Sequence, residues 1–155
     1  NIEETGMNRK SIAALAVAAA AIAVNAAWLP AAAAQGTAQV KTANRLVVQV
    51  TDGEAQRWNM ALNNIRNLQT ELGAANVEVE LVAYGPGINM LKADATTANR
   101  ISDAIKSGVK IVACENSLKA MKVSKDDMHG EIGYVPAGVV EIMRKQQEGW
   151  AYLRP

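Results

Sequence analysis

Hydrophobic positions from residue 44 onward follow two alternating spacings. Residues 46–50 form a short β-branched run, and residues 77–84 alternate apolar with polar side chains; both patterns are typical of strands. Between them, apolar residues recur at helical spacing over residues 58–72, and Gly73 is placed to end that helix. We expect Asp52 to cap the helix. The pattern therefore predicts a strand, helix, strand unit.

The same alternation continues to the end of the chain. Thr96 or Thr97 opens a second helix that Gly108 closes. The later segments are a strand at 109–113, a short helix at about 116–121, a helix start at Ser124 with Asp127, a strand at 132–135, a helix stopped by Gly149 and a strand at 150–153. Strands alternating with helices predict an α/β fold, a three-layer α/β/α sandwich whose mainly parallel sheet has about five strands.

The segment before residue 44 has a different pattern. After Met7, two basic residues, an apolar run at 12–24 and a small-residue stretch ending at Ala34 follow the order of a signal peptide. We predict a signal peptide at 7–34, cleavage near Ala34/Gln35, a flexible tether at 35–43 and one domain at 44–155. The protein is then periplasmic or secreted without a stable membrane anchor. An uncleaved anchor is the alternative, and residues 1–6 do not fit a leader.

Charge and cysteine content narrow the function classes. The chain has 16 basic and 15 acidic residues, so no electrostatic field favours a nucleic-acid partner. It has one cysteine, Cys114, which cannot form an internal disulfide. Cys114 is therefore either a small buried apolar residue or a thiol kept for chemistry.

Polar and glycine-rich segments follow three of the predicted strands. Ligands collect outside the carboxyl ends of the strands in open parallel sheets. The segments are Thr51-Asp52-Gly53, Gly85-Pro86-Gly87 and Cys114-Glu115-Asn116. A thiol just before a helix receives backbone N–H groups that favour the reactive thiolate, which makes Cys114 the leading catalytic candidate.

Other candidate sites are weaker. The Gly85-Pro86-Gly87 turn does not complete a dinucleotide-binding pattern, so we expect no nucleotide cofactor. Taken alone, these residues favour a tight strand-ending turn over a binding loop. His129 is the only histidine, and no metal-ligand spacing surrounds it, so we expect no metal. A Cys114–His129 nucleophilic pair is conceivable, but a solvated loop histidine is the simpler interpretation.

Four stretches of the chain resemble the DsrE/DsrF-like family of sulfur-relay proteins. They are WNMALNN from Trp58, VAYGPG from Val82, VACENSL from Val112, and VPAGVVEI from Val135 with the ending QQEGWAYLRP. The last resembles the ending of the small stand-alone branch of that family. The resemblance covers residues 44–155 and matches the predicted order of elements.

The resemblance implies homo- or hetero-oligomers, of which we expect a homo-oligomer, and a persulfide-carrying cysteine after a central strand. Cys114 occupies that position, so we expect a sulfur carrier or sulfurtransferase-like protein that needs no cofactor. Its partners would be sulfur donor and acceptor proteins or small sulfur compounds. Relay members of the family resemble cytoplasmic proteins, whereas we expect this chain to be exported.

The alternative is a non-catalytic oligomeric module that binds a small molecule or another protein and in which Cys114 is structural. Binding residues are expected at the strand ends in either case. They are Asp52, Asn59, Gly85, Pro86, Gly87, Glu115 and Asn116.

Overall fold

The computed structural model describes residues 44–155, and the predicted signal peptide and tether lie outside the described residues. The described chain forms one five-stranded sheet in the order β4-β3-β2-β1-β5, with every pair of neighbours parallel. The strands are β1 (Asn44–Val50), β2 (Val77–Ala83), β3 (Lys110–Cys114), β4 (Gly133–Val135) and β5 (Ala151–Leu153). The predicted fold class is confirmed.

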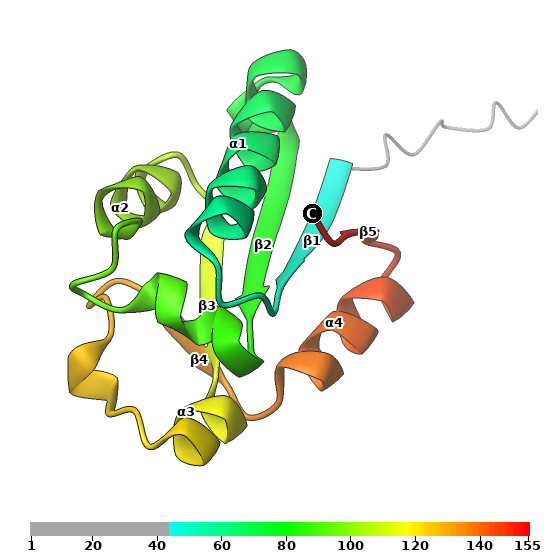
Figure 1. Ribbon diagram of the computed structural model, residues 1–155. Helices are drawn as coiled ribbons and strands as arrows, with labels where there is room; N and C mark the ends of the chain where they lie inside the picture. Colours follow the sequence, from blue (N-terminus) through cyan, green and yellow to red (C-terminus); the bar gives the residue numbers. More distant parts are fainter. Residues whose placement is uncertain (1–43) are drawn as a thin grey trace, which may run out of the picture. The chain divides into compact units, whose positions relative to one another are not determined.

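Four α-helices surround the sheet (Figure 1). They are α1 (Ala55–Leu72), α2 (Ala98–Lys106), α3 (Glu115–Met121) and α4 (Gly138–Gln147). Helices α1 and α2 cover one face and α4 covers the other. Right-handed crossovers explain why α4 covers a different face from α1 and α2. From β1 to β4, each strand is added on the same side of the one before it. The chain then passes through α4 to β5, which lies on the other side of β1, so this crossover runs in the opposite direction.

Each face of the sheet has its own apolar cluster. On the α1 and α2 side, Val48, Leu81 and Ile111 pack under helix residues such as Ile65 and Ile101. The α4 side has a smaller cluster, formed by Val47, Val82, Val112, Val135, Ile142 and Trp150. Since successive strand residues point to opposite faces, the central strands are apolar on both sides, which is typical of a covered parallel sheet.

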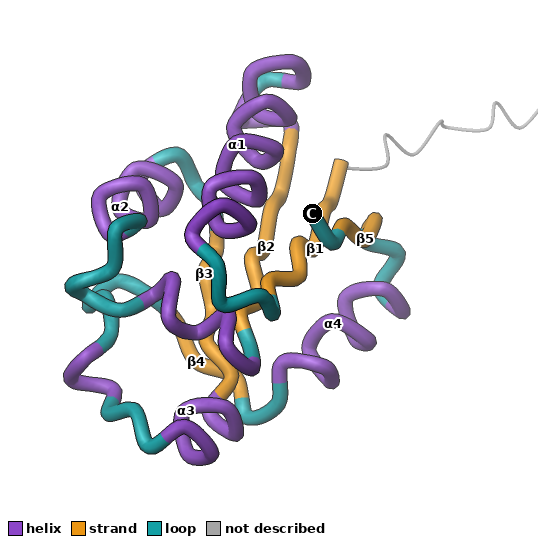
Figure 2. The backbone as a smooth tube through the Cα atoms, viewed as in Figure 1, coloured by secondary structure: helices purple, strands orange, loops and turns teal. Residues whose placement is uncertain are grey.

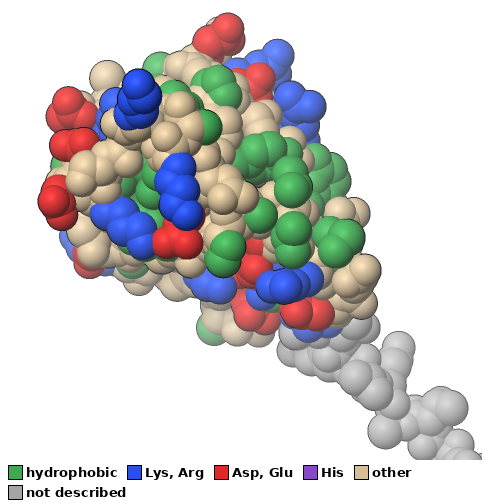
Figure 3. All heavy atoms as spheres, turned by 90° about the horizontal axis from the view of Figure 1, so that it is seen from below, with side chains coloured by type: hydrophobic (Ala, Val, Ile, Leu, Met, Phe, Trp, Pro, Cys, Tyr) green, Lys and Arg blue, Asp and Glu red, His purple; other side chains and the backbone are tan. Residues whose placement is uncertain are grey.

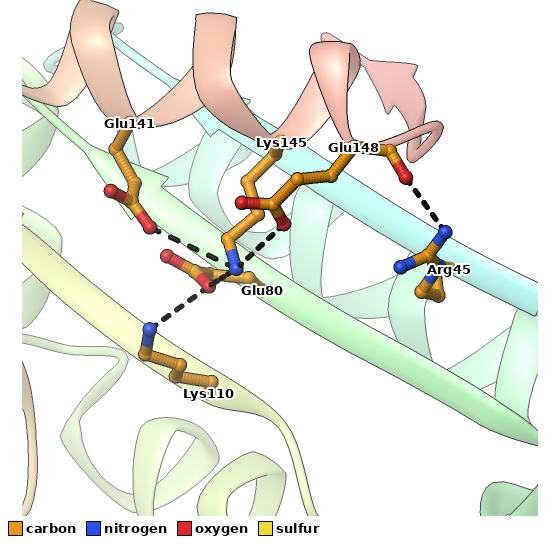
Figure 4. Close-up of polar contacts among 6 residues, drawn as sticks. All are labelled: Arg45, Glu80, Lys110, Glu141, Lys145 and Glu148. Carbon is orange, nitrogen blue, oxygen red and sulfur yellow. Dashed lines mark hydrogen bonds and ion pairs between the residues drawn. The ribbon is translucent and has the colours of Figure 1, made fainter.

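One charged residue interrupts the smaller cluster. Glu80 on β2 is fully buried, and its Oε2 atom lies 3.1 Å from Lys110 Nζ and 3.3 Å from Lys145 Nζ. Lys145 of α4 also approaches Glu141 and Glu148, at 3.9 and 3.8 Å (Figure 4). The network ties α4 to β2 and β3, because a buried carboxylate requires partners.

One local prediction was wrong, and one short helix was not predicted. Asp52 does not cap α1; the helix starts at Ala55 with Glu54 at the capping position, and the Asp52 carbonyl instead accepts a 2.6 Å bond from the Trp58 indole. The Gly85-Pro86-Gly87 turn after β2 is the start of a 3₁₀ helix, η2 (Gly85–Leu91), drawn as helix in Figure 2. Its Ile88, Met90 and Leu91 side chains are buried, so their packing favours a helical backbone in this segment.

Two more short elements lie in the connections between the longer ones. Ser124 and Asp127 do form a capping box as predicted, although it opens only a 3₁₀ turn, η3 (Lys125–Asp127). Another turn, η1 (Ala74–Asn76), joins α1 to β2. Among residues 44–155, no helix is both long and apolar enough to cross a membrane.

Candidate functional site

Cys114 is the last residue of β3 and the residue on which α3 begins. Val112, two positions earlier, packs on the α4 side of the sheet, so the alternation of a strand places the Cys114 side chain on that side too. The residue is 5% exposed, and its Sγ atom lies 3.9 Å from the Pro136 carbonyl oxygen. The thiol is therefore nearly covered by the segment between β4 and α4.

Hydrogen-bond donors from two helix starts converge on the thiol. Burial on its own raises the pKa of Cys114, but hydrogen bonds from the Ser117 hydroxyl and from the N–H groups of Gly138, Ser117 and Asn116 outweigh it and lower the pKa below its ordinary value. Ser117 lies one turn into α3 and Gly138 is the first residue of α4. The arrangement favours the thiolate, the nucleophilic form of cysteine.

The glycine turn after β2 supports this donor set. The Gly85 N–H group donates to Ser117 Oγ over 2.8 Å, which leaves the Ser117 proton free to face the sulfur. Gly87 lies against the end of β1, where an added Cβ atom would come within 2.2 Å of the Val50 carbonyl oxygen. Gly85 thus supports the surroundings of Cys114 through Ser117, whereas Gly87 allows the close approach to β1, and the Pro86 Cβ atom lies 3.3 Å from the place that a Cβ atom of Gly53 would take.

A hollow of about 340 Å³ opens on the same side of the sheet. We name it the Tyr84 hollow; its lining residues are Gln49, Tyr84, Val139, Ile142, Gln146 and Tyr152. Tyr84 follows β2 directly and packs against Gly138, whose added Cβ atom would lie 3.1 Å from the Tyr84 ring. Gly138 therefore contacts both Cys114 and Tyr84, and Tyr84 lines the hollow, whereas Cys114 is not among its lining residues.

The polar groups of the Tyr84 hollow are linked to one another. The Tyr152 hydroxyl donates to Gln49 Oε1 over 2.6 Å. Burial and the neighbouring Tyr152 raise the pKa of Tyr84, against the opposing effects of Arg154 and Gln49, so its phenol keeps its proton. The hollow lies at the carboxyl ends of β1 and β5, where the winding of the sheet reverses and ligands bind in open α/β sheets.

The structure places the other predicted residues in different surroundings. Asp52 lies near the hollow, with its Oδ1 atom 4.0 Å from Arg154 Nη2. Asn116 uses its N–H group to bond the Pro136 carbonyl at 3.2 Å. Glu115 pairs with Lys125 at 2.5 Å instead of facing the thiol. These contacts bring Asp52 and Asn116 to the same edge of the sheet as Cys114.

Asn59 and His129 belong to the opposite side of the molecule. Asn59 of α1 accepts a hydrogen bond from Arg100 of α2. His129 Nε2 lies 2.8 Å from Ser102 Oγ on α2, and its Nδ1 accepts from the Glu131 N–H group. Its described partners are therefore Ser102 and Glu131, in place of a Cys114–His129 pair. Within residues 44–155, no three metal-ligating side chains gather.

Sequence reasoning missed Ser117, Gly138, Tyr84 and Gln49. Ser117 carried a usable signal, because a hydroxyl three residues after a helix-start cysteine lies one turn away on the same face. Gln49 was a polar residue in an otherwise apolar strand. For Tyr84 and Gly138 the sequence carried no signal except that both lie next to turns, because only the packing of α4 brings these two residues together.

Comparison with known proteins adds the decisive observation. The model of the DsrE/DsrF-like family matches residues 44–155. The chain belongs to the DsrE/DsrF-like family. A solved DsrE-like protein of unknown function from Methanobacterium thermoautotrophicum is 36% identical, with a TM-score of 0.69 over 72% of this chain and 98% of that one.

A second solved protein shares the fold alone. It is a conserved protein of unknown function from Bacteroides thetaiotaomicron, 16% identical, with a TM-score of 0.59 over 72% of this chain and 95% of that one. No curated protein matches the sequence. The family model therefore gives the family, and neither solved protein has an assigned function.

Proposed function

We propose that this DsrE/DsrF-like protein is a sulfur carrier or sulfurtransferase that holds sulfane sulfur as a persulfide on Cys114. The observation that carries the proposal is the set of donors from Ser117 and Gly138, which lowers the pKa of a thiol at a strand end. Membership of the family is consistent with a sulfur-relay role. The step needs no metal or organic cofactor.

With thiosulfate as donor, the Cys114 thiolate attacks the outer, sulfane sulfur. A new S–S bond to Cys114 forms, the S–S bond of thiosulfate breaks, and sulfite leaves with the electron pair. An acceptor thiolate then attacks the terminal sulfur of the persulfide, and Cys114 leaves as thiolate. Donors that stabilise the thiolate also stabilise it as the leaving group of this second step.

Intact-protein mass spectrometry tests the proposal directly. The chain has one cysteine, so any thiol modification is on Cys114. Incubation with thiosulfate or polysulfide should add about 32 Da, and reduction should remove it, as for other reversible thiol modifications. Cys114→Ser is the matched control and should gain nothing while keeping its fold. A wild-type chain that never gains sulfur from either donor contradicts the proposal.

A second function is supported by the Tyr84 hollow. Linked hydroxyl and amide groups beside the apolar Val139 and Ile142 are typical of a small-molecule site, with Cys114 then structural. This binding-module function predicts that Cys114→Ala retains binding to any ligand of the hollow. An empty hollow across a metabolite screen, detected by thermal-shift measurement, would count against it.

Export and self-association complete the proposal. Cleavage after Ala34 would deliver the domain to the periplasm or outside the cell, and N-terminal sequencing of the mature protein checks it. Self-association is supported by apolar side chains exposed on α4 and β5, where Val139, Met143 and Tyr152 are 57, 51 and 43% exposed. Hydrophobic side chains gather on this side of the surface in Figure 3. Exposed apolar patches of this kind mark contact surfaces.

A further inference from the structure

A groove of about 190 Å³ runs between α1 and α2, on the face of the sheet opposite Cys114. The two helices cover the same side of the sheet (Figure 1). Its apolar lining comes from Leu62 and Ile65 of α1 and Ala104 of α2. The polar lining comes from Arg66, Gln69, Arg100, Asp103 and Ser107. Such a mixture of apolar surface and a few polar groups is typical of sites for small organic molecules.

Hydrogen bonds between the helices close both ends of the groove. At one end Arg100 donates to the Asn59 and Asn63 side chains, at 2.7 Å for Asn63. At the other end Gln69 Nε2 donates to the Ser107 carbonyl at 3.0 Å, and Ser107 Oγ donates to Gln69 Oε1 at 3.1 Å. Asn59 and Gln69 are ten residues apart, or about 15 Å along a helix. The groove is therefore held at a fixed width before any ligand arrives.

The charge of Arg100 is oriented but not neutralised. Its described partners are the carbonyl and side-chain oxygens of asparagines, which are neutral. Neither Arg100 nor Arg66 forms an ion pair with any residue in the range 44–155. A guanidinium has five N–H donors, so Arg100 retains donors beyond those used on α1. A half-buried arginine fixed in this way is suited to a planar anion.

We propose that the α1–α2 groove binds a small organic monocarboxylate. The carboxylate pairs with Arg100 and Arg66, and a short apolar body lies on Leu62, Ile65 and Ala104. A space of about 190 Å³ is smaller than the roughly 300 Å³ at the lower end of the range for ligand pockets, so the ligand is a short chain. Asp103 at the same groove disfavours ligands with several negative charges, since like charges repel.

Titration of the ¹⁵N-labelled full chain with pentanoate tests the proposal. Pentanoate combines one carboxylate with a short apolar tail, and pentanamide has the same shape without charge. Pentanoate should give saturable shifts of amide signals from both helices, including Ala104 and Gln69. Pentanamide should bind at least about tenfold more weakly, because charge-assisted hydrogen bonds are about twice as strong as neutral ones.

Variants separate ligand binding from the role of Arg100 as a tie between helices. Arg66→Gln removes one groove charge and none of the hydrogen bonds described, so it should weaken pentanoate binding severalfold with an unchanged fold. Arg100→Gln should weaken it at least about tenfold, and Arg100→Lys should recover only part of the loss because lysine lacks the fork. Arg57→Gln, at an exposed arginine of α1 outside the groove, is the matched control and should bind normally.

Four results would overturn the proposal. They are the absence of saturable shifts, equal binding of pentanamide, binding unaffected by both Arg66→Gln and Arg100→Gln, and movement of the same signals on protein dilution without ligand, which would make the groove a contact between copies. The Cys114→Ser chain should bind pentanoate as wild type does. Failure of the sulfur-carrier proposal can therefore be distinguished from failure of the carboxylate-binding proposal.

Discussion

Ser117 affects the chemistry of Cys114 more than any other single side chain. Its hydroxyl heads the hydrogen bonds that lower the thiol pKa, and it is itself fixed by the Gly85 N–H group. An acidified thiol reacts at lower pH because the thiolate is the reacting form. The position of one hydroxyl, set by the first turn of α3, thus controls the pH range over which Cys114 can react.

Ser117→Ala should raise the pKa of Cys114, because the largest of the stabilising hydrogen bonds is lost while burial still opposes ionisation. Rates of iodoacetamide alkylation measured across pH should show a midpoint at higher pH than in wild type. Ser102→Ala, which alters a hydroxyl paired with His129 on α2, is the control and should leave the midpoint unchanged. An unshifted Ser117→Ala profile would remove Ser117 from the site.

Gly87 and Gly130 should differ sharply in their tolerance of a methyl group. A Cβ atom at Gly87 would meet the Val50 carbonyl at 2.2 Å, whereas nothing lies within 4 Å at Gly130. Gly87→Ala should lower the free energy of unfolding by about 3 kcal/mol, the upper part of the range for overpacking. Gly130→Ala should change it by under ~0.5 kcal/mol. Urea denaturation measures both, and equal values would contradict the close approach of η2 to β1.

The position of Cys114 was predictable from sequence, but its surroundings were not. A short apolar run followed by Cys114 and a polar segment indicates a strand end, and the parallel-sheet rule then gives the edge. Gly138 is 24 residues away on another element, and nothing local shows that α4 begins beside the thiol. Asn59 follows the end of β1 in the sequence, but it belongs to α1, which covers the face of the sheet opposite α4, and the sequence did not indicate that face.

At the scale of elements, α4 depends on ion pairs more than the other helices do. Lys145 joins it to buried Glu80, and Glu141 lies near the same carboxylate. Burial and the hydrogen bond and charge of Glu80 raise the pKa of Glu141, against the opposing effects of Lys110 and Lys145. The helix therefore carries a carboxyl group that favours its protonated form in the folded state.

This raised pKa makes stability depend on pH. An unfolded glutamate releases its proton near pH 4.3, whereas folded Glu141 keeps its proton to higher pH. Between these values the folded state binds more protons, so the free energy of unfolding falls as pH rises through the window. Glu141→Gln should remove this part of the pH dependence. At pH values above the window, its free energy of unfolding should be higher than that of wild type.

Urea denaturation of both proteins from pH 4 to pH 8 measures the difference. Glu131→Gln, an exposed glutamate outside the network, is the matched control and should follow wild type. A Glu141→Gln protein that loses stability relative to wild type as pH rises would show that its pairing with Lys145 outweighs its repulsion from Glu80.

The elements themselves were mostly predictable because their two hydrophobic periods are distinct. The α1 stripe and the alternation of β2 gave their types and order. The 3₁₀ helix at Gly85–Leu91 was not predicted, because a short apolar run bounded by glycine does not show whether its side chains are buried by a loop, a strand or a 3₁₀ helix. Burial of Glu80 was also hidden, because alternating Glu78 and Glu80 indicated a solvated face.

At the scale of the whole molecule, the two faces differ in how completely they are covered. One helix, α4, covers its face, and its exposed Val139 and Met143 remain available for contact with a second copy. Met143→Glu should shift the proposed oligomer toward monomer in sedimentation equilibrium, because a desolvated charge disfavours association. Met60→Glu, at an exposed methionine of α1, is the control and should leave association unchanged.

The pairing of β1 with β5 also determines when the Tyr84 hollow can form during folding. β1, α1 and β2 are neighbours in sequence, whereas Tyr152 bonds Gln49 across 103 residues. Closing so long a loop carries a large entropic cost that must be met before the contact forms, so local units fold earlier. We therefore expect the β1–β2–β3 part to assemble first and β5, which completes the hollow, to pair last. A folding intermediate of this protein would already hold Cys114 at its strand end but would lack one wall of the neighbouring hollow.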